Sequence, residues 1–384
     1  MSLDKVKEPV VLQVLPEMEH GGVEVGTVEI AAGCQEKGIK NFVASSGGRM
    51  VYDLQKIKVQ HFELPLKTKN IFKMRSNAKK LAKIIKDNGI NIVHARSRAP
   101  AWSAYWAAKK SGVTFLTTYH GTYGLGFLKL KKLYNRVMTY GKLVIAISEH
   151  IKKHIMSEYK VPEEKIRLIH RCVNLDNFSP EKVSQERMIK VISDYNIPED
   201  RPVISLIGRI TPWKGQALLL EALSKMHNKN YCCLIVGSDQ GRTAYSNKLK
   251  DMVKKYGLDD RVQFIEHSFD IPALLMISDI VLSTAIEPEA FGRAAIEGQA
   301  MGKIVIASNI GGSLENTIDG VTGKLFKSGD AGDLASTIDW ALDLPKQEKT
   351  KISMAAIQNV KDHFTKQIMC DKTIAVYREL MNMK

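Results

Sequence analysis

Short apolar runs rich in β-branched residues alternate with helical patterns along the whole sequence, and this alternation constrains the fold most. In the first half, the strand candidates are Val10–Leu15, Asn41–Ser46, Asn91–His94, Thr114–Thr118 and Leu143–Ile147. In the second half, they are Val203–Ile207, Cys232–Val236, Val262–Ile265, Ile280–Ser283 and Ile304–Ala307. Such alternation is typical of parallel sheets that carry helices on both faces. We therefore expect an α/β protein built from doubly wound domains.

A charged, proline-containing stretch near residues 176–200 separates the two series of strand candidates. The chain has 384 residues, which is too long for one typical hydrophobic core. We predict two Rossmann-like domains, over residues 1–190 and 191–365, that face each other across a cleft. Residues 366–384 form a predicted C-terminal helix, for which a path back to the first domain is left open. Ligands bind such folds at the carboxyl ends of the strands, so the cleft is the expected site.

Basic residues are concentrated in the first half of the chain. The formal net charge is +15, and all of this excess lies within residues 1–185. Residues 66–86 contain eight basic residues and no acidic one, and their apolar residues recur every three or four positions. This spacing predicts a basic amphipathic helix. Residues 127–142 form a second acid-free stretch, which mixes apolar with basic side chains.

Two interpretations of these basic stretches stay open. Either their apolar residues face the core and the lysines are merely solvated, or the stretches bind an anionic membrane surface. Nucleic acid is another partner that such charge attracts. No recognisable nucleic-acid reader module accompanies the charge, so we expect no nucleic acid to bind.

The N-terminal residues and the cysteines argue against further classes of protein. The first 16 residues contain several charges and no apolar signal segment, and no run of 18 apolar residues occurs in the chain. We therefore expect a cytoplasmic protein that is peripheral on the inner face of the cytoplasmic membrane. The five cysteines are scattered without CxxC spacing, which indicates neither a disulfide framework nor a zinc site.

One loop of the second half combines glycine with positive charge. The strand candidate at 203–207 runs into Gly208-Arg209, and Lys214-Gly215 precedes the next helical pattern. Cations and backbone N–H groups at the start of a helix favour an anion such as a diphosphate. A turn with two solvated cations is the alternative.

A pair of glutamates follows the strand candidate at 280–283. Glu289 and Glu297 flank Phe291-Gly292, and their spacing corresponds to about 12 Å along a helix axis. This distance matches a nucleotide sugar whose sugar hydroxyls bind one carboxylate and whose ribose binds the other. One capping and one exposed glutamate are the alternative.

Two loops of the first half lie at predicted strand ends. Gly21-Gly22 follows the first strand, and glycine there leaves room for a phosphate or a sugar to approach the backbone, although a simple tight turn fits equally well. His120 follows the strand candidate at 114–118, which places it at the edge of the expected cleft. The absence of GxGxxG and GxxxxGKS/T motifs argues against a dinucleotide oxidoreductase and a P-loop NTPase.

Together these residues resemble a GT-B glycosyltransferase of the retaining family four, the glycogen-synthase-like group. Three family motifs have counterparts here: the GRxxxxKG loop in Gly208 to Gly215, the EX7E element in Glu289 and Glu297, and the glycine loop in Gly21-Gly22. The segments EPEAFGRAAIEGQAMG and HARSRAPAWSA are similar to those of α-proteobacterial glycosyltransferases that build the lipopolysaccharide core.

The resemblance implies transfer of a sugar from a nucleoside-diphosphate donor to a lipid-linked or lipopolysaccharide-core acceptor, with retention of anomeric configuration. It implies that the second domain binds the donor, that the basic first domain binds the acceptor, and that no cofactor or metal is required. The catalytic residues it implies are His120, Arg209, Lys214 and Glu289. The substrate-binding residues it implies are Gly21, Gly22, Gly208, Phe291, Gly292 and Glu297.

Two other functions stay open at this point. A GT-B-shaped epimerase or phosphorylase would act on the sugar nucleotide without a lipid acceptor. An inactive scaffold or nucleic-acid-binding protein would use only the basic first half, and it would bind DNA or RNA without sequence preference.

Overall fold

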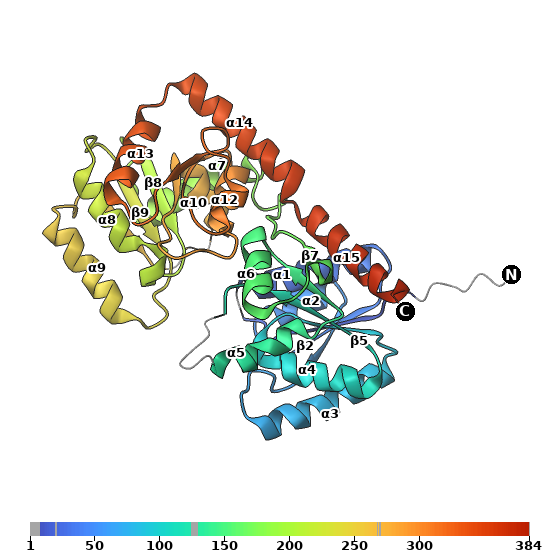
Figure 1. Cartoon of the computed structure of the whole chain (residues 1–384). Coiled ribbons are helices and arrows are strands. Elements are labelled where there is room, and N and C mark those ends of the chain that lie inside the picture. Colours follow the sequence, from blue (N-terminus) through green and yellow to red (C-terminus); the bar gives the residue numbers. More distant parts are fainter. Residues whose placement is uncertain (1–7, 20, 124–129, 267, 269, 384) are drawn as a thin grey trace. The chain divides into compact units, whose positions relative to one another are not determined.

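The computed structural model describes residues 8–19, 21–123, 130–266, 268 and 270–383 of the chain (Figure 1). The chain forms two compact units. The first comprises Met1–Arg171 and Lys366–Lys384, and the second comprises Cys172–Thr365. Each unit contains a parallel sheet flanked by helices, so the predicted α/β class with two Rossmann-like domains is confirmed.

The first unit contains a seven-stranded sheet in the order β3-β2-β1-β4-β5-β6-β7, and all its neighbouring strands are parallel. Its strands are β1 (Val11–Val14), β2 (Asn41–Ser45), β3 (Gln60–Glu63), β4 (Ile92–Ala95), β5 (Thr114–Tyr119), β6 (Leu143–Ala146) and β7 (Ile166–Leu168). Its α-helices are α1 (Gly22–Glu36), α2 (Val51–Lys56), α3 (Ile71–Asp87), α4 (Arg98–Ser111), α5 (Leu130–Asn135), α6 (Glu149–Tyr159) and α15 (Lys366–Asn382).

The second unit contains a six-stranded parallel sheet in the order β10-β9-β8-β11-β12-β13. Its strands are β8 (Val203–Ile207), β9 (Cys232–Val236), β10 (Val262–Ile265), β11 (Ile280–Ser283), β12 (Ile304–Ser308) and β13 (Lys324–Phe326). Its α-helices are α7 (Gln185–Tyr195), α8 (Gln216–Lys225), α9 (Thr243–Lys255), α10 (Ile271–Ile277), α11 (Arg293–Ala300), α12 (Ser313–Asn316), α13 (Ala331–Asp343) and α14 (Lys346–His363).

Strands of the second unit pack into two hydrophobic clusters, one on each face of the sheet. In β8, Ile204 and Leu206 belong to one cluster and Val203 to the other. In β9, Cys233 and Cys232 divide in the same way, so both thiols lie in the core. Because both faces are covered, these strands are continuous apolar runs, which is why the sequence pattern located them.

The boundary between the units lies nearer the N-terminus than the predicted position at residues 190/191. The structure divides the chain after Arg171. The charged stretch near 176–200, which has the composition of a linker, contains α7, and this helix packs against α10. Arg187 of α7 pairs with Asp270 at the start of α10 at 2.7 Å. The sequence between the two series of strands is therefore part of the second unit.

The last helix, α15, returns to the first unit and packs against α1 (Figure 1). Lys37, just beyond α1, forms an ion pair with Asp371 of α15. A Cβ at Gly33 of α1 would lie 2.8 Å from Cys370 Cβ, so glycine permits the close approach of the two helices.

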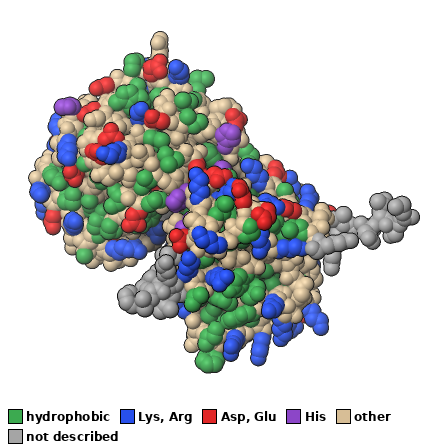
Figure 2. All heavy atoms as spheres, viewed as in Figure 1, with side chains coloured by type: hydrophobic (Ala, Val, Ile, Leu, Met, Phe, Trp, Pro, Cys, Tyr) green, Lys and Arg blue, Asp and Glu red, His purple; other side chains and the backbone are tan. Residues whose placement is uncertain are grey.

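The basic helix predicted near residues 66–86 is α3, and its apolar stripe faces the protein core. Met74, Ala78, Leu81 and Ile85 are buried, and the helix packs against α4. At its N-terminal end, Ile71 and Phe72 are exposed, the latter at 76%. Figure 2 shows blue Lys and Arg side chains over this part of the first unit.

The second basic stretch, 127–142, is described only from residue 130 onwards. Residues 127–129 lie outside the described residues, and Leu133 of α5 is 64% exposed. None of the described helices combines the length and the hydropathy needed to cross a bilayer.

Candidate functional site

Three loops follow the carboxyl ends of adjacent strands in the second unit. The β8–α8 loop spans residues 208–215, the β11–α11 loop spans 284–292 and the β12–α12 loop spans 309–312. β8 lies between β9, the next strand in the sequence, and β11. The strand order therefore reverses between β8 and β11, and ligands of doubly wound sheets bind at such a switch point.

The β8–α8 and β11–α11 loops are joined by polar contacts. The Thr284 hydroxyl donates to the Lys214 carbonyl oxygen at 3.0 Å, and the Lys214 ammonium forms an ion pair with the Glu289 carboxylate. A Cβ at Gly215, whose φ is +75°, would lie 1.9 Å from the Thr284 carbonyl oxygen. Glycine is therefore required for this approach of the two loops.

The β12–α12 loop fixes the backbone that carries Glu289. The Gly312 N–H donates to the Glu289 carbonyl oxygen at 2.8 Å. The Asn316 side-chain amide donates to the carbonyl oxygens of Phe291 and Gly292. A Cβ at Gly312 would lie 2.4 Å from Phe291 Cα, so a side chain there would push the loops apart. The backbone segment that carries the Glu289 carboxylate is therefore fixed by hydrogen bonds on both sides of the loop contact.

The two glutamates of the predicted pair lie in different types of secondary structure. Glu289 lies in the loop before α11 and is 5% exposed, whereas Glu297 lies within α11 and is 9% exposed. The expected helical separation of about 12 Å does not apply, because only one of the two residues is helical. Arg293 pairs with Glu297 at 2.6 Å, so each glutamate has a cationic partner of its own.

Phe291 and Gly292, between the two glutamates, have structural roles in this loop. The Phe291 ring is 3% exposed and packs against Phe364, with ring centroids 5.5 Å apart. Gly292 has a φ of +84° and precedes the first residue of α11. The Phe291 side chain points into the protein, so what this segment offers a ligand is its backbone.

Arg209 and Gly208 lie directly after β8. The Gly208 N–H donates to the Val236 carbonyl oxygen at 2.8 Å, and the Gln216 side-chain amide donates to the Arg209 carbonyl oxygen at 2.9 Å. The Arg209 side chain is exposed. Arg209, Lys214 and the N-terminal N–H groups of α8 therefore all belong to the segment that follows one strand end, and such groups suit a diphosphate.

In the first unit, the glycine loop lies at the corresponding switch point, between β1 and β4. Gly21 precedes α1 in an extended conformation that any residue adopts, with φ at 173°. A Cβ there would lie 2.6 Å from the Glu24 carboxylate, which is the end of a flexible side chain, so this position does not require glycine. Gly22 is the first residue of α1, and its carbonyl oxygen accepts a hydrogen bond from the Arg171 guanidinium.

His120 follows β5 and lines a small cavity in the first unit together with Thr118, Arg96 and Arg171. Within the described part of the chain, its Nε2 atom is buried and has no hydrogen-bond partner. Burial, and then the charges of Arg96 and Arg171, hold the pKa of His120 well below its ordinary value. A neutral ring with an available nitrogen is suited to a hydrogen bond with a sugar hydroxyl or a phosphate oxygen.

Comparison with known proteins identifies the family. A family model described as glycosyl transferases group 1 matches residues 189–359, and one described as glycosyltransferase family 4 matches residues 20–177. A solved glycosyltransferase of Rickettsia africae is 40% identical, covers 98% of this chain and 100% of that chain, and superposes with a TM-score of 0.91. The chain belongs to the family-four glycosyltransferases of the GT-B fold.

More distant proteins share less with this glycosyltransferase. The D-inositol 3-phosphate glycosyltransferase of Mycolicibacterium smegmatis is 28% identical over 242 residues, which are 62% of this chain and 53% of that protein. The chain thus spans about half the length of the curated relatives it matches. HepE of Anabaena, solved with UDP-glucose, is 21% identical with a TM-score of 0.82, and the match covers 95% of this chain and 98% of that one. WaaG, a glycosyltransferase involved in lipopolysaccharide biosynthesis, is 17% identical with a TM-score of 0.75, over 96% and 99% of the chains. Both likenesses show the fold.

Four buried polar residues of this glycosyltransferase are not among the site residues predicted from the sequence: His94, Arg96, Arg171 and Tyr377. Arg96 and Arg171 are 2% and 4% exposed, and a Cβ at Gly26 would lie 2.6 Å from the Arg171 guanidinium. Arg96 was detectable, because it directly follows β4 at the switch point, where ligands of doubly wound sheets bind. Arg171 and Tyr377 are distant in sequence from every motif, so no local signal pointed to them.

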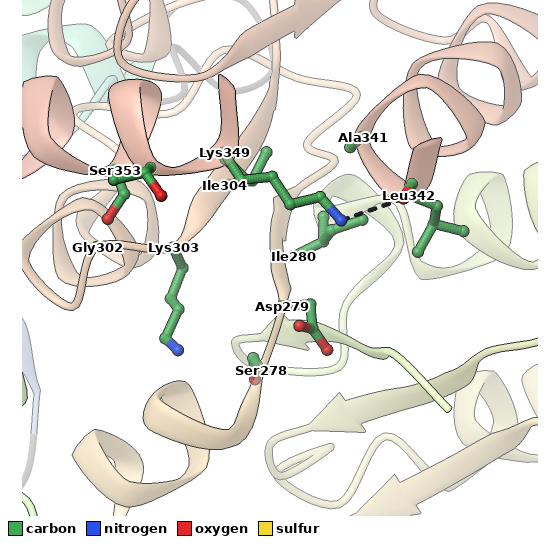
Figure 3. Close-up of a pocket in the computed structure, with 11 residues that line it drawn as sticks. Ser278, Asp279, Ile280, Gly302, Lys303, Ile304, Ala341, Leu342, Lys349 and Ser353 are labelled. Carbon is green, nitrogen blue, oxygen red and sulfur yellow. Dashed lines mark hydrogen bonds between the residues drawn. The ribbon is translucent and has the colours of Figure 1, made fainter. Parts of the chain in front are cut away.

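A separate pocket of about 260 Å³ lies at the opposite edge of the second sheet (Figure 3). It opens beside Ile280 and Ile304, the first residues of β11 and β12. Its two lysines serve neighbouring helix ends: Lys349 donates to the Leu342 carbonyl oxygen at 3.1 Å, and Lys303 donates to that of Met276 at 2.6 Å. These contacts satisfy carbonyl groups at the ends of helices, so the lysines are explained without a ligand.

No group of three His, Cys, Asp or Glu side chains lies close enough to hold a metal ion in the described part of the chain.

Proposed function

We propose that this glycosyltransferase moves a hexose from a nucleoside-diphosphate sugar to a phosphorylated glycolipid of the lipopolysaccharide-core type, with retention of anomeric configuration. The observation that carries the donor half of the proposal is the Lys214–Glu289 ion pair, held by contacting loops at the switch point. It places a cation and a carboxylate together, as a diphosphate and a hydroxylated sugar require. HepE of Anabaena was solved with UDP-glucose, which makes that donor the first to test.

The proposed reaction uses these residues as follows. As the anomeric C–O bond breaks, the leaving diphosphate gains negative charge, which Arg209, Lys214 and the N-terminus of α8 stabilise electrostatically. The Glu289 carboxylate accepts hydrogen bonds from the sugar hydroxyls, and Glu297 accepts hydrogen bonds from the ribose. The acceptor hydroxyl attacks the anomeric carbon on the face that the diphosphate leaves, and a phosphate oxygen takes its proton. The neutral His120 ring orients the sugar.

The acceptor half of the proposal depends on charge and on relatives. All of the excess positive charge lies in the first unit, which suits a phosphorylated acceptor. The mycobacterial relative is named for D-inositol 3-phosphate, and WaaG is involved in lipopolysaccharide biosynthesis. Both support a phosphorylated glycan or glycolipid as the acceptor class.

A donor screen followed by product analysis tests the proposed function. UDP-, GDP- and ADP-sugars are compared for their effect on Tm, because a ligand at 100 times its Kd stabilises the native state by about 2.7 kcal/mol. The stabilising donor is then incubated with lipopolysaccharide-core acceptors, and the anomeric configuration of the product is determined by NMR. We expect an α-linked product from an α-linked donor, with one nucleoside diphosphate released per transfer.

Other outcomes of this experiment would favour the alternatives. Conversion of the donor sugar without transfer to an acceptor would indicate an epimerase. Lack of stabilisation by every sugar nucleotide, together with salt-sensitive binding to DNA, would indicate the scaffold or nucleic-acid-binding function.

We also propose that the protein binds the inner face of the cytoplasmic membrane through the N-terminal end of α3. Ile71 and Phe72 are exposed there beside basic side chains, although the rest of the apolar stripe is buried. We expect vesicles that contain phosphatidylglycerol to float with the protein at low salt. About 1 M salt, which reduces the Debye length to about 3 Å, should release it.

A double substitution tests the location of the contact. Ile71→Ser with Phe72→Ser should reduce flotation at low salt, whereas Tyr52→Ser on α2, which removes another exposed apolar side chain of the same unit, should not. Flotation that is insensitive to salt, or equal for all variants, would show that α3 is not the membrane contact.

A further inference from the structure

The His120 ring is not oriented by a hydrogen bond at its Nε2 atom. Among the described residues, that nitrogen is buried and has no partner. This nitrogen is therefore available to a ligand. The orientation of the ring must then be set by contacts other than a hydrogen bond at this atom. The nearest fixed structure in the sequence is β5, which ends one residue earlier at Tyr119.

A buried hydrogen-bond chain anchors the end of β5 to the C-terminal helix. The Tyr377 hydroxyl of α15 lies 2.8 Å from His94 Nδ1, and His94 Nε2 lies 2.7 Å from the Thr118 hydroxyl. The relative exposures of Tyr377, His94 and Thr118 are 0%, 0% and 3%. The rings of Tyr377 and His94 also meet edge-on, with centroids 5.7 Å apart. Both ring nitrogens of His94 are therefore used.

The donors and acceptors in this chain follow from the charge state of His94. Burial, and then the charge of Arg96, hold the pKa of His94 well below its ordinary value. Its ring is therefore neutral, and it donates through one nitrogen and accepts through the other. Burial raises the pKa of Tyr377, which keeps its phenol protonated. Tyr377 O–H can then donate to His94 Nδ1, while His94 Nε2–H donates to the Thr118 oxygen.

The same helix also lines the cavity beside His120. Met369 and Thr373 of α15 line the cavity that Thr118 and His120 line. α15 is itself held on the first unit, for example by the ion pair between Lys37 and Asp371. One helix thus lines the cavity beside His120 and is linked, through His94 of β4, to the strand that precedes His120.

We infer that Tyr377 and His94 are positioning residues that act through Thr118 to hold the end of β5, and with it the His120 ring, in the orientation that the donor sugar requires. This inference rests on the proposed role of His120 in the reaction. The alternative is that the chain only stabilises the core of the first unit, and the two differ in what they predict for turnover.

The first measurement compares two buried tyrosines. Tyr377→Phe keeps the ring and removes the hydroxyl. Tyr231→Phe is the matched control, because Tyr231 is also 0% exposed but lies in the second unit, where its hydroxyl contacts the Leu223 carbonyl oxygen at 3.4 Å. With UDP-glucose as the donor, the lipopolysaccharide-core acceptor or water taking up the glucose, and UDP release as the readout, Tyr377→Phe should lower kcat about 10-fold with little change in KM. Tyr231→Phe should leave kcat unchanged, and the Tm of both variants is measured beside kcat.

A double-mutant cycle separates positioning from general stability. In the His120→Ala background, Tyr377→Phe should cause no further loss of kcat, because its effect passes through the missing ring. Thr118→Val should reproduce the loss of Tyr377→Phe, and Thr118→Ser, which keeps the hydroxyl, should restore turnover. Losses that multiply in the double variant would overturn the inference.

An NMR measurement on the full chain decides the inference independently of turnover. The His120 imidazole signal is assigned by its disappearance in His120→Ala. Tyr377→Phe should shift that signal, and Tyr231→Phe should leave it in place. If UDP-glucose is not turned over but the signal shifts, the proposed donor is wrong and the positioning stands. An unmoved His120 signal in Tyr377→Phe would rule the positioning out.

Discussion

Alanine at Arg209 or Lys214 is expected to lower kcat/KM by about 100-fold or more, which is the usual effect of losing one preorganised donor to a developing negative charge. Both residues belong to the β8–α8 loop, at the strand end where the N-terminus of α8 adds its own positive potential. Steady-state kinetics with the donor found by thermal shift measure the effect.

Lys225→Ala is the matched control for this expectation. Lys225 is also a lysine of the second unit, and its ion pair with Glu221, at 2.7 Å, lies on the surface of α8. Its loss should change kcat/KM by no more than about 2-fold from the unmodified protein, since exposed ion pairs contribute only about 0–1 kcal/mol to stability. Chelation is the second control. Turnover that stops with EDTA and returns with Mn²⁺ would show that a metal, and not these two cations, stabilises the leaving group.

Glu289→Gln is expected to lower kcat about 10- to 100-fold, because a carboxylate that accepts hydrogen bonds from sugar hydroxyls contributes about 1.5–3 kcal/mol. The variant also leaves the Lys214 ammonium without its anionic partner at a largely buried position. Losing one partner of a buried pair costs about 3–5 kcal/mol, so the free energy of unfolding should fall as well. Kinetics and urea unfolding are measured on the same preparation.

Glu221→Gln removes the same charge from the exposed pair with Lys225 and serves as the control for Glu289→Gln. We expect the control to change neither kcat nor stability by a large factor. A Glu289→Gln variant that is destabilised but keeps full kcat would give Glu289 a purely structural role and leave the sugar hydroxyls to other residues.

The strands and the loops that follow them were predictable because their signals are local. A strand that is covered on both faces is a continuous apolar run, so β8 and β11 stood out in the sequence. In a parallel sheet, whatever follows a strand lies at its carboxyl edge, which predicted that Arg209 and Glu289 belong to the same edge. The alternation of strands and helices likewise predicted two Rossmann-like units.

Some predictions depended on which other part of the protein packs against a segment, and the sequence pattern does not contain that information. The spacing of Glu289 and Glu297 fits a helix, but Glu289 lies in a loop that Gly312 holds at Glu289 and Asn316 holds at Phe291. The apolar stripe of α3 fitted a membrane surface and the core equally well, and its packing against α4 decided for the core along most of its length.

The sequence by itself determined the two α/β units, the family and the residues that follow each strand, because periodicity and short motifs depend on neighbours in the chain. The tertiary structure decided which of those residues meet. It paired Lys214 with Glu289, 75 positions further on, and it brought Tyr377 to His94 across 283 positions by returning α15 to the first unit. Such contacts depend on the spatial order of the strands in each sheet and on which helix covers which face of it. No local sequence pattern contains that information.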